Sequence, residues 1–268
     1  WSHNATTSVQ QNYTLQGAGV GDVDVSGATL VARSAWLWGK RGAAAITYFA
    51  SASNPIDTGS LSANPVSVTP PGSMVAGDLV VLVAYSSNLD TFTINEAGGQ
   101  TWTAENAIQK SNNSWQTVRL FWSRFNGTWS ANPSVLGFSA GGTNRGSLLM
   151  HVFRPTNGSN TWAIDVAQSG NIFEDPASPY DVTIANINTQ TNGALVLAVW
   201  GSYDDNSWTL QTAGWSNAGG AQYRNNAGGD LSQSSAYKVM ATAGATGNVT
   251  NQQTALGPDA GIYLIIAF

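Results

Sequence analysis

Few side chains in this sequence have the types and spacing that catalysis requires. The two histidines are His3 and His151, and His151 lies within an apolar run that predicts a core strand. A hydrogen-bonded structural role is therefore favoured for His151 over that of a base or a ligand. The three glutamates, Glu96, Glu105 and Glu174, could supply the two carboxylates of glycoside hydrolysis. No motif pairs them, so we expect solvated loop charges and predict no catalytic residue and no enzyme.

Metal and cofactor chemistry has few candidate residues. Cysteine is absent, which removes zinc–thiolate sites and disulfides. The stretches Asp22-Val23-Asp24 and Asp204-Asp205-Asn206 could supply oxygen ligands to calcium, yet neither has the full spacing of a calcium loop. We expect both stretches to form turns and predict no cofactor and no metal site, with calcium binding as the alternative.

Tryptophan is the residue type with the clearest binding potential, and the chain has 11 of them. Three that lie among polar residues are candidates for a glycan-binding surface, since an aromatic ring offers an apolar face beside a polar edge: Trp115, Trp129 and Trp162. A second candidate is an assembly interface near the N-terminus formed by Trp36, Leu37 and Trp38. The alternative for this second group is packing on the chain's own fold.

The composition restricts the partners and indicates a β-rich fold. Charged residues make up 9% of the 268 residues and the formal net charge is -5, so a basic nucleic-acid-binding face is not expected. No apolar run reaches the ~18 residues that predict a membrane-spanning helix. Many small polar residues and few Lys or Glu are typical of short strands joined by tight turns, and 42% hydrophobic residues provide for a core.

An internal repeat organises the chain. A shift of 116 residues places Leu79 to Val83 on Leu195 to Val199, and Phe92 on Trp208. Both apolar runs predict central strands that are covered on both faces, so we expect Leu82 and Leu197 to be buried. The repeat divides the chain into an N-terminal arm, residues 1–44, and two copies, residues 45–155 and 156–268.

These patterns predict an all-β fold of two tandem homologous β-sandwich, jelly-roll-like units with an N-terminal arm. Turn signals recur between short apolar runs, and no amphipathic helical stretch is evident. A unit of ~110 residues is long enough to close its own sandwich. The alternative is that both copies contribute strands to one sandwich.

Several short motifs carry a resemblance to a known family. They are Ile46-Thr47-Tyr48-Phe49, Pro70-Pro71-Gly72, Ala76-Gly77-Asp78-Leu79, Gly99-Gln100-Thr101-Trp102 and Val152-Phe153-Arg154-Pro155. Together they resemble a β-sandwich module that is common in tailed-bacteriophage virion proteins and in large secreted bacterial surface proteins. The resemblance covers roughly residues 45–268. It implies display, attachment or assembly rather than catalysis, and it carries no catalytic residues.

Three hypotheses follow for the function. The first is a non-enzymatic virion-surface structural protein of a bacteriophage, such as a decoration, tail or fibre component. The second is a secreted subunit of a bacterial or archaeal surface filament, in which a strand at Thr7 to Gln16 completes the sheet of a neighbouring subunit. The third is a carbohydrate-binding or adhesive module that uses exposed tryptophans. All three imply a location on the virion surface or outside the cell, with copies of the chain, other structural subunits or a cell-surface glycan as partners.

Overall fold

Every regular element of the described chain is a β-strand, as the sequence predicts. The computed structural model describes residues 45–56, 64–112, 114–139, 146–156, 161–174, 179–225, 231–254 and 260–268. The N-terminal arm lies outside these residues, and with it the predicted interface of Trp36, Leu37 and Trp38. No helix long and apolar enough to cross a membrane occurs in the ranges given above.

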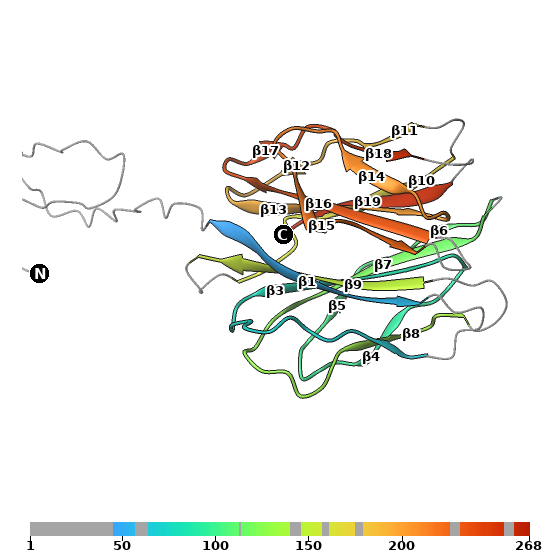
Figure 1. Cartoon of the computed structure of the whole chain (residues 1–268). Coiled ribbons are helices and arrows are strands. Elements are labelled where there is room, and N and C mark those ends of the chain that lie inside the picture. The colour runs from blue at the N-terminus through green and yellow to red at the C-terminus, as the bar shows by residue number, and fades with distance from the viewer. Residues whose placement is uncertain are drawn as a thin grey trace, which may run out of the picture. The chain divides into compact units, whose positions relative to one another are not determined.

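Two large antiparallel sheets form the centre of the molecule (Figure 1). The first has the order β1-β9-β3-β7-β5, and β6 also pairs with β7. Its strands are β1 (Ile46–Ile56), β3 (Leu79–Ser86), β5 (Thr103–Ala104), β6 (Ile108–Lys110), β7 (Gln116–Arg124) and β9 (Gly146–Pro155). The second has the order β10-β19-β13-β16-β15. Its strands are β10 (Val166–Phe173), β13 (Ala194–Ser202), β15 (Ser216–Asn225), β16 (Leu231–Met240) and β19 (Gly261–Ala267).

Smaller sheets form the two outer layers (Figure 1). One has the order β2-β8-β4 and consists of β2 (Val66–Ser67), β8 (Ser134–Leu136) and β4 (Thr93–Glu96). The other has the order β11-β18-β14 and consists of β11 (Tyr180–Ile184), β18 (Val249–Thr254) and β14 (Ser207–Leu210). A two-stranded ribbon of β12 (Asn188–Thr189) and β17 (Gly244–Ala245) completes the set of small sheets. The result is a sandwich-like stack of β layers.

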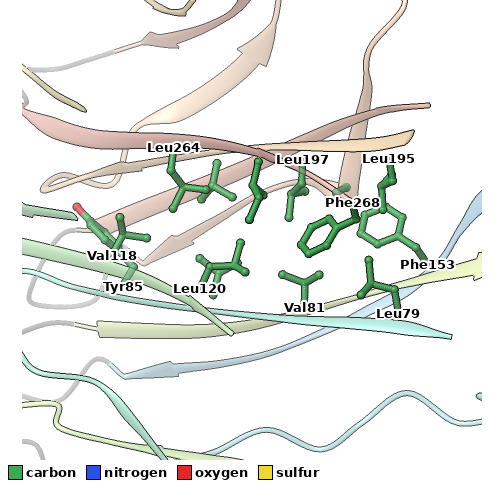
Figure 2. Close-up of a cluster of buried hydrophobic side chains, with 14 of the residues drawn as sticks. Leu79, Val81, Tyr85, Val118, Leu120, Phe153, Leu195, Leu197, Leu264 and Phe268 are labelled. Atoms are coloured by element: carbon green, nitrogen blue, oxygen red, sulfur yellow. The ribbon is translucent and has the colours of Figure 1, made fainter. Parts of the chain in front are cut away.

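Three hydrophobic clusters lie between these layers. The middle cluster draws on both large sheets, and Figure 2 shows residues such as Leu79 and Val81 pointing toward Leu195 and Leu197. One outer cluster lies between the first large sheet and β2, β8 and β4, and the other lies between the second large sheet and β11, β14 and β18. Each large sheet therefore buries both of its faces.

This arrangement explains the continuous apolar runs. In β3, alternate residues Leu79, Val81 and Val83 join the middle cluster, while Val80, Leu82 and Ala84 join the outer one. β13 divides its side chains in the same way. Every residue of both strands is buried. The prediction that both strands are central and covered on both faces is confirmed, as is the burial of Leu82 and Leu197, each 0% exposed.

The two large sheets correspond strand by strand. Reading each order from its first edge pairs β1 with β10, β9 with β19, β3 with β13 and β7 with β16. β3 lies between β9 and β7 with Val83 opposite Leu149 and Leu120, and β13 lies between β19 and β16 with Val199 opposite Leu264 and Ser235. The register therefore fixes which residue of one large sheet stands at the position of which residue of the other.

Candidate functional site between the large sheets

The three tryptophans expected on a glycan-binding surface differ in exposure and in the residues that they contact. Trp115, just before β7, is 58% exposed. Trp129 is partly buried and stacks on Phe125, with ring centroids 5.0 Å apart. Trp162 is also partly buried, packs against the middle cluster, and donates a hydrogen bond from Nε1 to the carbonyl of Gly77 at 2.8 Å. The structure does not assemble these three side chains into one aromatic platform.

The glutamates act as ties between elements. Glu96 Oε1 accepts a hydrogen bond from the backbone N–H of Gly98 at 2.8 Å. Glu105 Oε1 accepts one from Trp122 Nε1 at 3.0 Å. Glu174, which follows β10, forms an ion pair with the fully buried Lys110 of β6, and thereby links the two large sheets. Glu96 thus stabilises the chain just after β4, Glu105 contacts β7 within the first large sheet, and Glu174 links the two large sheets.

The acidic stretch at residues 204–206 forms a turn, as its residue types predict. Asp204 Oδ1 accepts a hydrogen bond from the backbone N–H of Asp205 at 2.7 Å. The buried Asn206 side chain donates to Gln253 Oε1 at 3.0 Å and so fixes the turn to β18. No group of three metal-ligating residues occurs in the part of the chain that the structure describes. Asp22-Val23-Asp24 lies outside the described residues.

A buried ion pair at the start of β3 was not predicted. Asp78, 0% exposed, accepts hydrogen bonds from Arg154 Nε at 2.9 Å and Nη2 at 2.8 Å, and from the backbone N–H of Val75 at 2.9 Å. The hydrogen bond to Asp78 raises the pKa of Arg154. Its guanidinium also lies 3.8 Å from the ring centroid of Phe49. Both ionic residues lie in motifs that carry the family resemblance, which was the only sequence signal for them.

His151 lies in the interface between the large sheets. It is 2% exposed, and its Nε2 lies 3.1 Å from Ser235 Oγ of β16. The prediction of a hydrogen-bonded core residue is therefore confirmed. Burial lowers the pKa of His151 to about 4. A second polar contact spans the same interface, in which Ser147 Oγ donates to Gln233 Oε1 at 2.7 Å. We call these four residues the polar flank.

The polar flank adjoins a cavity of about 150 Å³ between β1 and β9 on one side and β15 and β16 on the other, which we call the interface cavity. Its wall consists of Ser51, Ala52, Ser53, Leu149, His151, Ala218, Gly219, Gln233 and Ser235. Ser51 and Ser53 are exposed and mark its mouth, whereas His151, Gln233 and Ser235 are buried. Among the residues that the structure describes, no charged side chain belongs to this wall. The cavity is thus a small, uncharged, hydrogen-bonding site.

A larger hollow of about 320 Å³ lies at the edge of the first large sheet, and its polar groups are already occupied. Arg119 donates from Nη1 to the carbonyl of Phe92 at 2.6 Å and from Nε to the carbonyl of Glu105 at 2.8 Å. Trp102 Nε1 donates to the carbonyl of Ala97 at 2.9 Å. The interface cavity is the stronger candidate because two residues of its wall have buried polar atoms without a hydrogen-bond partner, His151 Nδ1 and Gln233 Nε2.

Sequence reasoning identified His151 but not the site around it. The available signal was the presence of Ser147 and His151 in the largely apolar β9, together with the polar run of β16 that includes Gln233 and Ser235. No family model, no curated protein and no solved structure matches this chain.

Proposed function

We propose that the chain is a non-enzymatic structural protein that works by assembly, as a virion-surface component of a tailed bacteriophage. The observation that carries this proposal is that the side chains with catalytic potential make structural contacts. Glu105 binds a tryptophan, Glu174 binds a buried lysine, and His151 binds a serine across an interface. A side chain that is held in such a contact contributes to the rigidity of the body.

We also propose that residues 45–155 and 156–268 are two homologous copies of one β-sandwich unit. The identical strand order of the two large sheets supports this proposal, as does the register that places Leu79 and Leu195 in corresponding strands. Phe153 and Phe268 also occupy corresponding positions, next to Leu79 and Leu195. Fusion through the two large sheets leaves the small sheets and the strand edges as the surfaces for partners.

Assembly would depend on the N-terminal arm. Trp36, Leu37 and Trp38 lie outside the repeat, and a solvated tail rarely contains two such tryptophans. Burial of two tryptophan side chains removes roughly 300–500 Å² from water. At about 25 cal/mol per Å², this amounts to several kcal/mol, enough to anchor an interface.

The test is the native size of the full chain and of a variant with Trp36→Ala, Leu37→Ala and Trp38→Ala. Multi-angle light scattering should show an oligomer for the full chain and a monomer for the variant, with unchanged circular dichroism. Trp115→Ala is the matched control, because it removes an exposed tryptophan from another surface. A full chain that is a monomer at high concentration, or a variant that keeps the oligomer, would show that the arm does not mediate assembly.

A filament subunit assembled by strand addition is the second candidate, and the position of β1 favours it. β1 is 11 residues long, lies at the edge of the first large sheet, and pairs only with β9 among the described strands. Such an edge can accept a further strand. Residues 7–16 of a neighbouring subunit could supply it. Electron microscopy separates the candidates, since strand addition gives open polymers whose length increases with concentration, whereas a closed assembly has one size.

A further inference from the structure

The polar flank departs from the internal correspondence of the large sheets. By register, Ser147 and His151 of β9 stand where β19 has Ile262 and Ile266. Likewise, Gln233 and Ser235 of β16 stand where β7 has Val118 and Leu120. We call these four apolar residues the apolar flank, and all of them belong to the middle cluster. At these four positions the same fold therefore places hydrocarbon on one side of the interface and hydrogen-bonding groups on the other.

An aromatic pair on each side of the interface keeps the correspondence. Trp122 and Phe268 form an edge-to-face pair with ring centroids 5.6 Å apart. Their counterparts, Tyr237 and Phe153, form an edge-to-face pair at 5.4 Å. The two pairs lie on opposite sides of the interface. In one pair the first large sheet supplies the ring from β7 and the second supplies Phe268 after β19, and in the other the second large sheet supplies the ring from β16 and the first supplies Phe153 of β9. This aromatic packing is thus matched on both sides, whereas the polarity of the two flanks is not.

The backbone leaves room for the interface cavity. Gly219 in its wall has a φ of 77°, a conformation that suits glycine. A Cβ at this position would lie 2.7 Å from Ser51 Oγ and 3.0 Å from Tyr48 Oη. Both neighbouring edge strands change register at this point, β1 between Tyr48 and Ala50 and β15 between Asn217 and Gln222. Such bulges occur preferentially beside functional sites.

Two buried polar atoms of the wall lack a protein partner. Gln233 Nε2 is a donor, and the oxygen of the same amide is already bound to Ser147. His151 Nδ1 is the ring nitrogen that does not face Ser235. Buried polar groups are nearly always satisfied, and the cavity volume of about 150 Å³ far exceeds the ~10–15 Å³ that one water needs. The unused groups and the free volume point to a ligand larger than one water.

The chemistry of the wall specifies the class of ligand. An ion is disfavoured because the described residues of the wall include no charged side chain and a buried charge must be paired. The serine hydroxyls of the wall can both donate and accept hydrogen bonds, while the side-chain amide of Gln233 offers an N–H donor. Leu149, Ala52 and Ala218 supply apolar surface beside these groups. A compound with several hydroxyl groups on a short carbon skeleton matches this mixture.

We propose that the interface cavity is a binding site for a small, uncharged polyhydroxy compound, a polyol or a single sugar unit. The compound enters between Ser51 and Ser53, accepts a hydrogen bond from Gln233 Nε2, and engages His151 Nδ1. The site lies within one chain, so it is independent of the assembly proposed above. Binding would tie β1 and β9 of one large sheet to β15 and β16 of the other.

The experiment uses the full chain with ¹⁵N-labelled histidine and the probes glycerol and D-glucose. His151 reports from the cavity wall, and His3 is the internal reference because the chain has only these two histidines. A saturable change in the His151 Nδ1 shift is expected with at least one probe, while the His3 signals stay constant. Acetate is the charged comparison and should cause no saturable change.

Two variants make the test specific. Ser53→Trp places a large side chain at the exposed mouth and should weaken binding at least about tenfold. Ser169→Trp is its control at an exposed position of β10, the edge strand that corresponds to β1, and should bind like the unmodified chain. The double variant Ser147→Ile with Gln233→Val converts one pair of the polar flank to its apolar counterpart, so it should fold and lose binding.

Several outcomes would overturn the proposal. If neither probe gives a saturable change in the unmodified chain, the cavity holds only water. If Ser53→Trp binds as well as Ser169→Trp, the compound binds elsewhere. If acetate binds and the polyols do not, the ligand class is wrong.

Discussion

The burial of His151 makes the stability of this protein depend on pH in a defined window. In the unfolded chain the imidazole has its ordinary pKa of 6.5, and in the folded protein burial lowers the pKa to about 4. As the pH falls below 6.5, the unfolded state takes up a proton at His151 that the folded state does not accept. The contribution of the neutral, buried His151 to the unfolding free energy is therefore fully present above pH 6.5. It declines between pH 6.5 and pH 4 and is lost below pH 4.

The size of this effect follows from the two pKa values. A pKa that falls from 6.5 to about 4 corresponds to a loss of about 3 kcal/mol of unfolding free energy. The cause of the lowered pKa is burial, and the side chains that face His151 include two uncharged groups, Tyr48, with ring centroids 6.4 Å apart, and Ser235. The loss is a large fraction of the ~5–15 kcal/mol that a typical protein has.

The assay is urea unfolding at several pH values between 7 and 4, for the unmodified chain and for His151→Gln. Glutamine is uncharged throughout and can still bind Ser235. The unmodified chain should lose about 3 kcal/mol more than the variant across this window. Comparison of the two slopes removes the contribution of the ionisable groups that both proteins share. His3→Gln should leave the slope unchanged, and equal slopes for His151→Gln and the unmodified chain would refute the assignment.

Other predictions concern the core and the interface. Leu82→Ala and Leu197→Ala should each lower the unfolding free energy by about 2–5 kcal/mol, because both side chains are fully buried; near-neutral thermal melts would mean that neither is a core position. Gly201→Ala should destabilise by about 1–3 kcal/mol, since the added Cβ would lie 2.7 Å from the buried ring of Tyr85. Tyr85→Leu should relieve part of this loss in the double variant, and strictly additive losses would argue against the contact.

The sequence predicts the fold well wherever local pattern and internal comparison determine it. The repeat predicted corresponding strands for Leu79 and Leu195, and the register places them so. Continuous apolar runs indicated burial on both faces of β3 and β13. The pattern could not identify what covers the second face, because a strand that packs on another sheet and one that packs on a partner chain have the same composition.

The candidate site was less accessible from the sequence because its contacts are long-range. Ser147 and Gln233 are 86 residues apart, and His151 and Ser235 are 84 residues apart. Only the packing of two complete sheets brings these residues together. Trp162 was assigned to the surface from its polar neighbours in sequence, but Gly77, 85 residues away, accepts a hydrogen bond from its indole N–H. Polar context therefore does not indicate exposure where a distant backbone carbonyl satisfies the polar atom.

The pH dependence and the ligand site share His151, and this coupling provides a stringent check on both. A ligand that binds only the folded state raises the unfolding free energy according to its concentration and its Kd. Polyols also stabilise proteins generally, by exclusion from the surface. Exclusion acts equally on Ser53→Trp and Ser169→Trp, so only the difference between these two variants measures the site. Since Ser53→Trp leaves His151 buried, its pH slope should match that of the unmodified chain while its specific stabilisation by polyol disappears.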